Sequence, residues 1–380
     1  MALCYRAWAE IDLHAFQQNL DWIKFRVGGR KIISVVKADA YGHGLRQIAA
    51  SLMQFGTDIF GVANLQEAAA VRTVGKGWPI LMLGAAMPDE WPQLIKLRVR
   101  PTLSSLKEAR GFSELATKSN LTLPVHIKVD TGMGRLGFQP SEFLQRYSEL
   151  AALKGIQIEA LYSHFSSAED DAHFTRQQTT QFHAIIEALR IKDVSIPPLH
   201  LANSAGILFE QDSLHDFVRP GLLVYGVIPK GKRNLKSSLA KELLPVLSFK
   251  SRVTLVRQLP KGATVSYGHT YRVPKKMTIA TLGLGYGDGL PREASNRGSI
   301  LIRGKSCKIL GRVTMDQTLV DASEIESEIQ EGDEAVIIGA SGDARLDVND
   351  WAETCGTIPW AILTGITYRV PRIYKGGSAS

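Results

Sequence analysis

Cysteine and long apolar runs are scarce in this sequence of 380 residues. Its cysteines, Cys4, Cys307 and Cys355, are too few and too far apart to predict a disulfide framework or a zinc site. No apolar stretch reaches the roughly 18 residues of a membrane-spanning helix. The N-terminal segment MALCYRAWAEIDLHAF has no basic region followed by an apolar one, so we expect no signal peptide. These absences favour a reduced, cytoplasmic protein without a metal site or a membrane partner.

The charge balance is basic, with a formal net charge of +8. Such an excess suits nucleic acid or an anionic small ligand. The basic residues do not cluster, however, and the densest runs are only 229–236 and 273–277. We therefore favour a solvated basic surface and predict no nucleic-acid partner.

Residues from about 30 to 225 alternate between short apolar runs and amphipathic segments. The runs are KIISVVKA, DIFGVA, PILMLGA, VRPTLS, LPVHIKVD, IQIEALYSH, PPLHLAN and HDFVRPGLLVYG. Their length and their β-branched residues are typical of buried parallel strands. Eight strands with intervening helices predict an α/β fold, a (β/α)8 TIM-type barrel. A doubly wound open sheet is the alternative, but no GxGxxG motif supports a dinucleotide site.

The pattern changes after about residue 245. Segments such as VLSFKSRVTLVRQL, MTIATLGLG and EAVIIG alternate with a period of two between turn signals. This alternation predicts a smaller, mostly antiparallel β-domain after the barrel.

Reactive groups of a barrel lie at the carboxyl ends of its strands. The residues predicted there are Lys37, Lys128, Arg135, His164, Asn203, Ser204 and Arg219. Because unpaired Lys and Arg are costly to bury, several of them at one mouth indicate an anionic ligand. The stretches NSAG and RPGLLVYG suit phosphate binding, although ordinary turn glycines and a helix cap explain them equally well. Lys37 is either a surface charge or an amine that forms a Schiff base with pyridoxal phosphate (PLP).

The stretch VVKADAYGHG closely resembles the PLP-attachment signature of alanine racemases. The resemblance continues, in the family's order, through KVDTGMGRLGF, HLANSAG, VRPGLLVYG, VSYGHTY, GLGYGDG, GRVTMDQTLVD and TGITYRVPRIY. It implies a first strand, residues 1–12, that joins the β-domain, a PLP barrel at 13–238 and a β-domain at 239–380. It also implies a head-to-tail homodimer in which each β-domain completes the partner's active site.

Two residues are implied as catalytic bases on opposite faces of the substrate. Lys37 would carry PLP and act on one face, and Tyr267 would act on the other. His164 would connect Tyr267 to Arg219, whose guanidinium would face the pyridine nitrogen of PLP. Since a guanidinium donates hydrogen bonds but has no acceptor, it would leave that nitrogen largely unprotonated.

The resemblance also assigns the binding residues. Those implied for the cofactor, besides Lys37, His164 and Arg219, are Tyr41, Asn203, Ser204, Gly221, Leu222 and Trp360. Arg135 and the Met315 amide would bind the substrate carboxylate. Lys128 matches a position that is often carbamylated in the family, and a plain lysine is the alternative. Trp360 replaces the family's usual tyrosine, which predicts a weaker phosphate contact or a tighter entrance.

The resulting prediction is a racemase that interconverts L- and D-alanine and supplies D-alanine for the cell wall. A relative acting on serine or on several amino acids is the alternative. A non-catalytic PLP carrier would resemble the barrel alone, and an RNA-binding barrel has no motif in support.

Overall fold

The computed structural model describes residues 5–233 and 242–376. Its contacts divide the chain into two units. The barrel unit comprises Gln17–Ala40 and Gly44–Leu243, and the β-unit comprises Met1–Phe16, Tyr41–His43 and Leu244–Ser380. The predicted boundary between 238 and 239 and the cysteine at position 4 lie outside the described residues.

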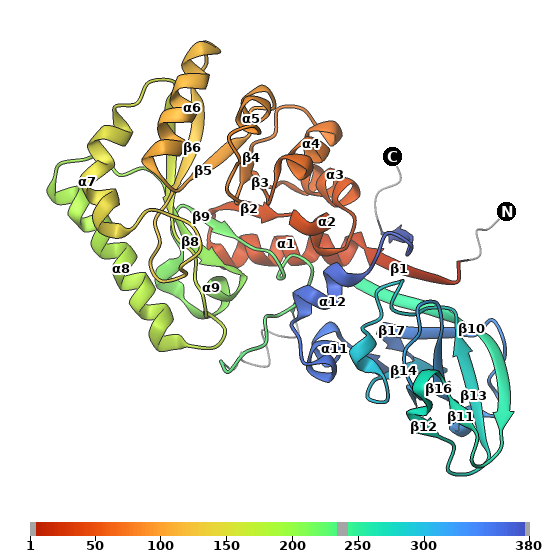
Figure 1. Cartoon of the computed structure of the whole chain (residues 1–380). Coiled ribbons are helices and arrows are strands. Elements are labelled where there is room, and N and C mark those ends of the chain that lie inside the picture. Colours follow the sequence, from red (N-terminus) through yellow and green to blue (C-terminus); the bar gives the residue numbers. More distant parts are fainter. Residues whose placement is uncertain (1–4, 234–241, 377–380) are drawn as a thin grey trace. The chain divides into compact units, whose positions relative to one another are not determined.

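The barrel unit contains a closed barrel of parallel strands (Figure 1). Its strands are β2 (Lys31–Val35), β3 (Ile59–Val62), β4 (Ile80–Met82), β5 (Arg100–Leu103), β6 (Leu123–Lys128), β7 (Ile156–Tyr162), β8 (Leu199–Asn203) and β9 (Phe217–Arg219). The ring closes where β9 pairs with β2. The predicted (β/α)8 barrel is thereby confirmed, and each apolar run supplies one strand.

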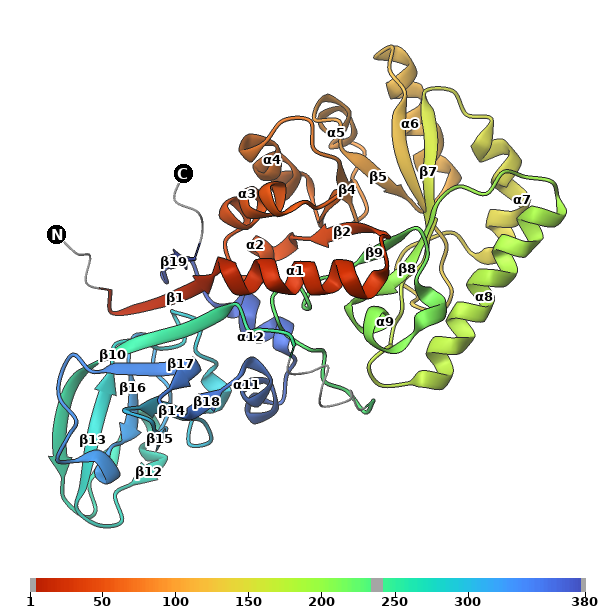
Figure 2. The same cartoon turned by 180° about the vertical axis from the view of Figure 1, so that it is seen from behind.

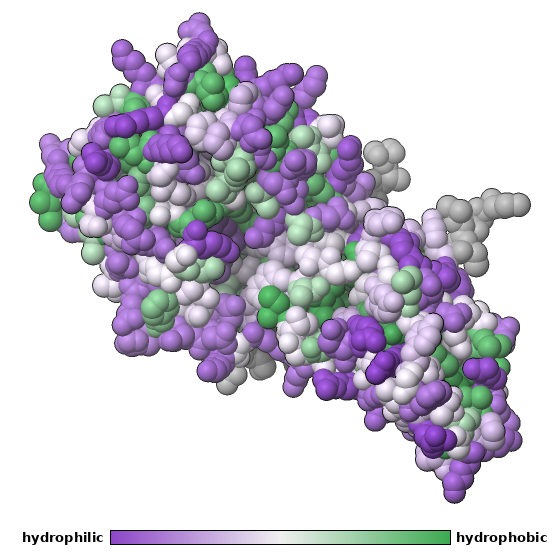
Figure 3. All heavy atoms as spheres, in the orientation of Figure 1, coloured by the Kyte–Doolittle hydropathy of each residue, from purple (hydrophilic) through white to green (hydrophobic). Residues whose placement is uncertain are grey.

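Helices cover the outside of the barrel, as the view from behind also shows (Figure 2). They are α3 (Leu45–Phe55), α4 (Leu65–Val74), α5 (Trp91–Lys96), α6 (Leu106–Lys118), α7 (Pro140–Ala151), α8 (Ala172–Ile191) and the short α9 (Ser204–Phe209), while α1 (Leu13–Val27) leads into β2. Several begin at a side-chain cap; Asn64, Ser105 and Asp171 each accept from a backbone N–H three residues on. On the face that the space-filling view shows, the surface of the barrel unit is mainly hydrophilic with scattered apolar spots (Figure 3).

The apolar faces of strands and helices form the core of the barrel unit. One buried cluster takes one residue from each of five strands: Ile33, Ile59, Leu81, Ala160 and Phe217. Each buried aliphatic or aromatic side chain of this size contributes about 1.5–3 kcal/mol.

The β-unit is built around a mixed sheet of nine strands. These are β1 (Ala7–Asp12), β10 (Leu247–Leu259), β13 (Met277–Leu282), β14 (Ser299–Ile302), β15 (Lys305–Lys308), β16 (Thr318–Asp321), β17 (Glu334–Ser341), β18 (Ala344–Leu346) and β19 (Arg372–Lys375). The long β10 pairs antiparallel with β1, β13 and β17, and β1 pairs parallel with β19. A two-stranded ribbon, β11 (Thr264–Val265) and β12 (Tyr271–Arg272), and helices α11 (Val348–Cys355) and α12 (Pro359–Gly365) complete the unit.

The first barrel strand is shorter than we predicted. The apolar run predicts a strand that ends at Lys37, but β2 ends at Val35. The Val36 amide still donates to the Gly61 carbonyl, and Lys37 then opens a tight turn, α2 (Lys37–Tyr41). The lysine therefore stands just beyond the strand, on a turn.

Candidate active site

The turn after Lys37 has an unusual backbone. Four successive non-glycine residues, Ala38 to Tyr41, have φ of 52–53°, in the left-handed region. That conformation costs a non-glycine residue about 1–2 kcal/mol. Two carboxylates offset this cost, since Glu67 Oε1 accepts from the Ala38 amide and Asp39 Oδ1 from the Leu45 amide, both at 2.7 Å.

The amine of Lys37 lies in a cationic environment. Burial, and then the charge of Arg135, lower the pKa of this lysine, while the Glu67 carboxylate opposes the change. Lowering the pKa raises the fraction of neutral amine, the form that attacks a carbonyl. Glu67, which the sequence did not reveal, thus braces the turn and moderates the charge of Lys37.

Arg219, the last residue of β9, lies in the interior with 3% of its surface exposed. It donates to His200 Nδ1 at 2.6 Å and to the carbonyls of Ser163 and Leu201 at 2.7 and 2.9 Å. A fourth contact reaches His164 Nδ1 at 3.3 Å. Burial lowers the pKa of Arg219 to about 10, so this side chain is a fixed cation at neutral pH.

Behind Arg219 a chain of hydrogen bonds crosses the barrel. His200 Nε2 lies 2.9 Å from His126 Nδ1, and His126 Nε2 lies 3.0 Å from Glu159 Oε2. Glu159 also forms a two-point ion pair with Arg100, one bond of which measures 2.8 Å. Five consecutive strands, β5 to β9, each contribute one member of this chain.

The histidines of this chain are neutral and its carboxylate is ionised. Burial lowers the pKa of His126 and lowers that of His200 well below its usual range. Burial disfavours the charged form of Glu159, but the hydrogen bonds from His126 and Arg100 outweigh it and hold the pKa at about 2. Sequence reasoning missed these residues because no local motif connects strand positions so far apart.

Lys128, the last residue of β6, is also buried. Burial, then Arg135, then Arg219 lower its pKa to about 8. The loop that leads on to Arg135 is held by Asp130, whose carboxylate accepts from the amides of residues 132, 133 and 134 at 2.8–2.9 Å. Lys128 and Arg135 thus bring further positive charge to the mouth that contains Lys37 and Arg219.

The predicted phosphate residues meet where β8 and β9 end. Ser204 is the first residue of α9, and the Asn203 side chain caps this helix by accepting from the Gly206 amide. Ser204 Oγ accepts from the amides of Gly221 and Leu223 at 2.9 and 3.4 Å. Its hydroxyl proton remains available to donate to an anion. Leu222, between these amides, is buried in the same loop.

The other predicted residues belong to the β-unit. Tyr267 lies in a short turn between β11 and β12 with 71% of its surface exposed, and Met315 is 51% exposed. Trp360 is half-buried on α12, and Tyr41 falls in the short segment that clusters with this unit.

Glycines of the GLGYGDG motif allow its backbone to lie close to the backbone of the loop that contains Met315. The Gly287 amide donates to the Met315 carbonyl at 2.9 Å. A Cβ on Gly285 would lie 2.0 Å from the Thr314 carbonyl oxygen, closer than any side chain allows. Glycine at 285 thus lets two motifs that are distant in sequence pack against each other.

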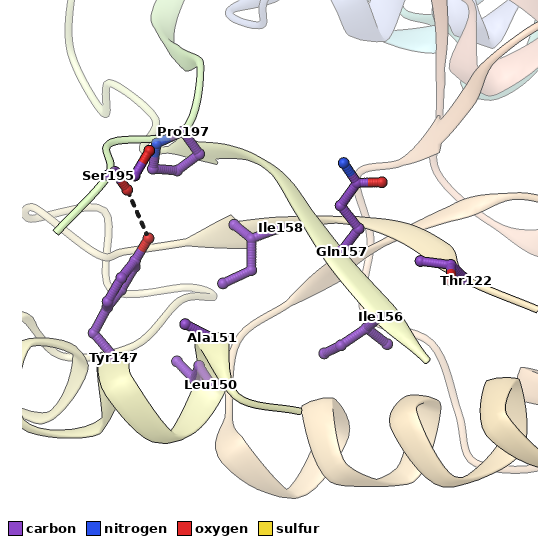
Figure 4. Close-up of a pocket in the computed structure, with 9 residues that line it drawn as sticks. All are labelled: Thr122, Tyr147, Leu150, Ala151, Ile156, Gln157, Ile158, Ser195 and Pro197. Carbon is purple, nitrogen blue, oxygen red and sulfur yellow. Dashed lines mark hydrogen bonds between the residues drawn. The ribbon is translucent and has the colours of Figure 1, made fainter. Parts of the chain in front are cut away.

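A separate hollow on the outside of the barrel has a volume of about 450 Å³ (Figure 4). Ile156 and Ile158 of β7 face Leu150 and Ala151 of α7 there, and Tyr147 donates to the Ser195 carbonyl at 3.4 Å. None of the predicted site residues lines this hollow, so it is distinct from the cationic mouth.

Comparisons with known proteins agree with this geometry. Residues 11–229 match the family model "Alanine racemase, N-terminal domain" and residues 246–374 match "Alanine racemase, C-terminal domain". The chain belongs to the alanine racemase family. It is 42% identical to the alanine racemase of Halothermothrix orenii, with 97% of this chain and 96% of that protein covered.

Solved structures of alanine racemases have the same fold. That of Clostridium difficile 630 has a TM-score of 0.91 and 33% identity, over 98% of this chain and 96% of its own. That of Bartonella henselae, described with covalently bound pyridoxal phosphate, has a TM-score of 0.89 and 29% identity over 98% and 100%. The chain is therefore a racemase, and the match of both alanine racemase domains disfavours a carrier that resembles the barrel alone.

Within 5–233 and 242–376, every helix is too short or too polar to cross a lipid bilayer. The same ranges contain no group of three His, Cys, Asp or Glu side chains placed to bind a metal ion.

Proposed function

We propose that this protein is a PLP-dependent alanine racemase that interconverts L- and D-alanine in the cytoplasm and supplies D-alanine for peptidoglycan. The observation that carries the proposal is the set of cations around Lys37. Arg135 lowers the pKa of both Lys37 and Lys128, Arg219 lowers that of Lys128, and burial acts on both lysines in the same direction. An anionic cofactor and a substrate carboxylate would neutralise this charge.

The donor set fits PLP. Arg219 presents a buried guanidinium, which could donate to a ring nitrogen, and the Ser204 hydroxyl has a proton to give to a phosphate oxygen. When bound, PLP supplies an electron sink that makes the Cα–H of an amino acid acidic. The protein's part is to fix the orientation of the ring and to move one proton.

Two bases are needed to invert a stereocentre. Lys37 suits one role because its lowered pKa gives it a neutral amine more often than an ordinary lysine. We assign the other to Tyr267, which would remove or return the proton on the opposite face. Arg135 and the Met315 amide would hold the substrate carboxylate between them.

We propose that Lys128 is carbamylated. Carbon dioxide reacts with a neutral amine. Because the pKa of Lys128 is about 8, roughly a quarter of its amine is neutral near pH 7.5. For an ordinary lysine the neutral fraction at this pH is about one part in a thousand. The carbamate would be an anion among cations and would brace Arg135. Electron density at Lys128 in a crystal structure tests this assignment.

We also propose a homodimer with shared active sites. The β-unit exposes several large apolar side chains: Tyr267 at 71%, Tyr286 at 41%, Met315 at 51%, Ile358 at 55% and Tyr368 at 95%. Four of these residues, all except Ile358, lie in the motifs that carry the family resemblance. A second copy of the chain would cover them.

The direct test of the activity is exchange of deuterium into alanine, followed together with circular dichroism. We expect L- and D-alanine each to lose optical activity and to gain deuterium at Cα. Serine and other amino acids, assayed in parallel, test the broader specificity. A PLP-loaded enzyme that racemises none of them would refute the proposal.

Mixing two inactive variants tests whether the sites are shared. If Lys37 and Tyr267 of one site come from different subunits, a mixture of Lys37→Ala and Tyr267→Phe should recover part of the activity. Each variant mixed with itself is the control. A mixture that stays as inactive as its components would contradict shared sites.

Trp360 is expected to make the entrance narrower or the phosphate contact weaker than tyrosine would. Indole has one N–H donor and no acceptor, and it is larger than phenol. We predict that Trp360→Tyr changes either KM or the affinity for PLP by a few-fold. Unchanged steady-state kinetics and an unchanged PLP titration would show that this position has neither effect.

A further inference from the structure

A second cationic cavity lies at the end of the barrel opposite to Lys37. Its volume is about 680 Å³, within the range of small-molecule sites. Its lining comes from the segments that precede three strands: Trp78 and Pro79 before β4, Arg98 before β5, and Thr122 before β6. The cavity is therefore at the amino ends of the strands, whereas catalytic groups lie at the carboxyl ends.

Five basic residues line this cavity: Arg72, Lys76, Lys96, Arg98 and Arg100. No Asp or Glu is among the lining residues that the structure describes. In the described ranges, only Arg100 forms an ion pair, with Glu159 on the barrel strand β7. The other four basic residues line the same cavity without an ion pair in the described ranges, and an anion bound there would be attracted by all of them.

Arg72 is fixed in its position by hydrogen bonds to the backbone. Its guanidinium donates to the carbonyls of Trp78 at 2.7 Å, Leu97 at 3.1 Å and Arg98 at 3.3 Å, and so holds the loops before β4 and β5 together. These acceptors carry no charge. Burial, then Arg100 and Arg98, lower the pKa of Arg72, as expected where positive charges meet without a counter-charge.

The rest of the lining is apolar. Leu97, Leu121, Leu123, Pro79 and Pro124 contribute aliphatic surface, and Trp78 contributes a half-buried indole whose ring meets Phe60 edge-on at 6.0 Å. A bare inorganic anion would make no contact with these apolar side chains. A ligand with both a phosphorylated part and a ring would contact both parts of the lining.

We propose that this cavity binds a small phosphorylated molecule with a planar ring, of the nucleotide class, at a site separate from the active site. Lys76, Lys96 and Arg98, which are exposed and have no ion pair within the described residues, would contact the phosphates. Trp78 and the neighbouring leucines would contact the ring. The inference does not depend on the proposed racemase activity.

Calorimetric titration of the PLP-loaded enzyme with ATP tests the site, at an ionic strength of about 0.15 M. We expect ATP to bind, and inorganic tripolyphosphate and adenosine each to bind at least about ten-fold more weakly. The variant Lys76→Glu/Arg98→Glu should weaken ATP binding by about ten-fold or more, since each charged contact is worth that much. Racemase activity should be unchanged, which shows that the barrel is folded.

The matched control is Lys261→Glu/Lys305→Glu, which changes the net charge equally at two exposed positions of the β-unit. It should alter ATP affinity less than about two-fold. Equal losses in both double variants would reduce the effect to net charge and overturn the site. Absence of ATP binding, or tripolyphosphate binding as tightly as ATP, would overturn it as well. If the glutamate variant does not fold, Lys76→Gln/Lys96→Gln is compared with Lys261→Gln/Lys305→Gln, which again changes the net charge equally.

Discussion

Arg219 shows how a single residue keeps its charge in a protein interior. An unpaired buried cation is expensive, but this guanidinium donates to two carbonyls and a histidine within 3 Å. The acceptors within 3 Å are neutral, and the hydrogen-bond chain that begins at His200 leads through His126 to the carboxylate of Glu159. The position of Arg219 is thus connected to His126 and Glu159, which it does not contact.

His126 is the residue that tests this dependence. We predict that His126→Leu lowers the free energy of unfolding by about 2–3 kcal/mol, because it removes the partner of His200 and one partner of Glu159 in the interior. Urea unfolding of the apoenzyme measures the loss. Tyr147→Phe, which removes one long hydrogen bond of 3.4 Å, should cost less than about 0.5 kcal/mol. Equal stabilities of the two variants would argue against a cooperative chain.

Lys128 makes stability depend on pH. Its pKa is about 8 in the folded protein and 10.5 for an ordinary lysine, so between these values the unfolded chain holds a proton that the folded chain has released. The free energy of unfolding therefore rises with pH across this window. We predict that wild type gains about 2 kcal/mol relative to Lys128→Met from pH 8 to pH 10.

Denaturant titrations of both apoproteins in buffer free of carbon dioxide measure this gain, because the lysine is then not carbamylated. A stability difference that stays constant over the window would mean that Lys128 has an ordinary pKa. Repeating the series with bicarbonate should flatten the curve if the carbamate forms.

At the scale of elements, the turn of α2 is the most strained feature of the barrel unit. Ala38 has φ of 52° and an exposed side chain. We predict that Ala38→Gly raises the free energy of unfolding by about 0.5–1 kcal/mol, because glycine adopts this backbone without a Cβ clash. Thermal unfolding measures the change.

The matched control for this turn is Ala184→Gly, at an exposed position in the middle of the right-handed helix α8. Glycine there should lower stability by about 1 kcal/mol. The two substitutions are chemically identical and should act in opposite directions. A loss of stability in both variants would show that the α2 turn is not strained.

Periodicity predicted the strands but not this turn. Apolar runs with β-branched residues define all eight barrel strands, because every strand is buried on both faces. The segment KADAY, in contrast, contains no glycine to signal a left-handed backbone. The turn exists because Glu67 and Asp39 bind its amides, which is tertiary context that no local pattern contains.

The residues of the candidate site likewise fall into those that the sequence predicts and those that it does not. Lys37, Lys128 and Arg219 could be predicted because barrel topology brings strand ends together. Arg100 begins β5, and His126, Glu159 and His200 lie inside their strands, where a polar residue looks like an isolated exception in an apolar run. Only the closed order of the strands shows that they are neighbours.

At the scale of the whole molecule, the exposed aromatic side chains of the β-unit predict an assembly. Tyr368, with 95% of its surface exposed, should become buried when two copies associate. We predict that Tyr368→Glu weakens the dimer at least about ten-fold, since a buried unpaired charge is unfavourable in an interface. Sedimentation velocity over a range of concentrations measures this.

Phe25→Glu is the control for that experiment. Phe25 is 88% exposed on α1, and none of the family motifs contains it. This substitution should leave the dimer unchanged. Dissociation by both variants, or by neither, would contradict an interface at Tyr368.

The chain from Arg219 to Arg100 also has a direction. Arg219 can only donate, so we infer that His200 carries its proton on Nε2, that His126 does the same, and that Glu159 accepts at the far end. A carboxylate in place of Arg219 would accept instead, and both imidazoles would have to exchange tautomers. Glu159 would then have to become a donor. The kind of group at position 219 therefore fixes the protonation state that Glu159 must have, and the two positions can change only together with the tautomers of His126 and His200.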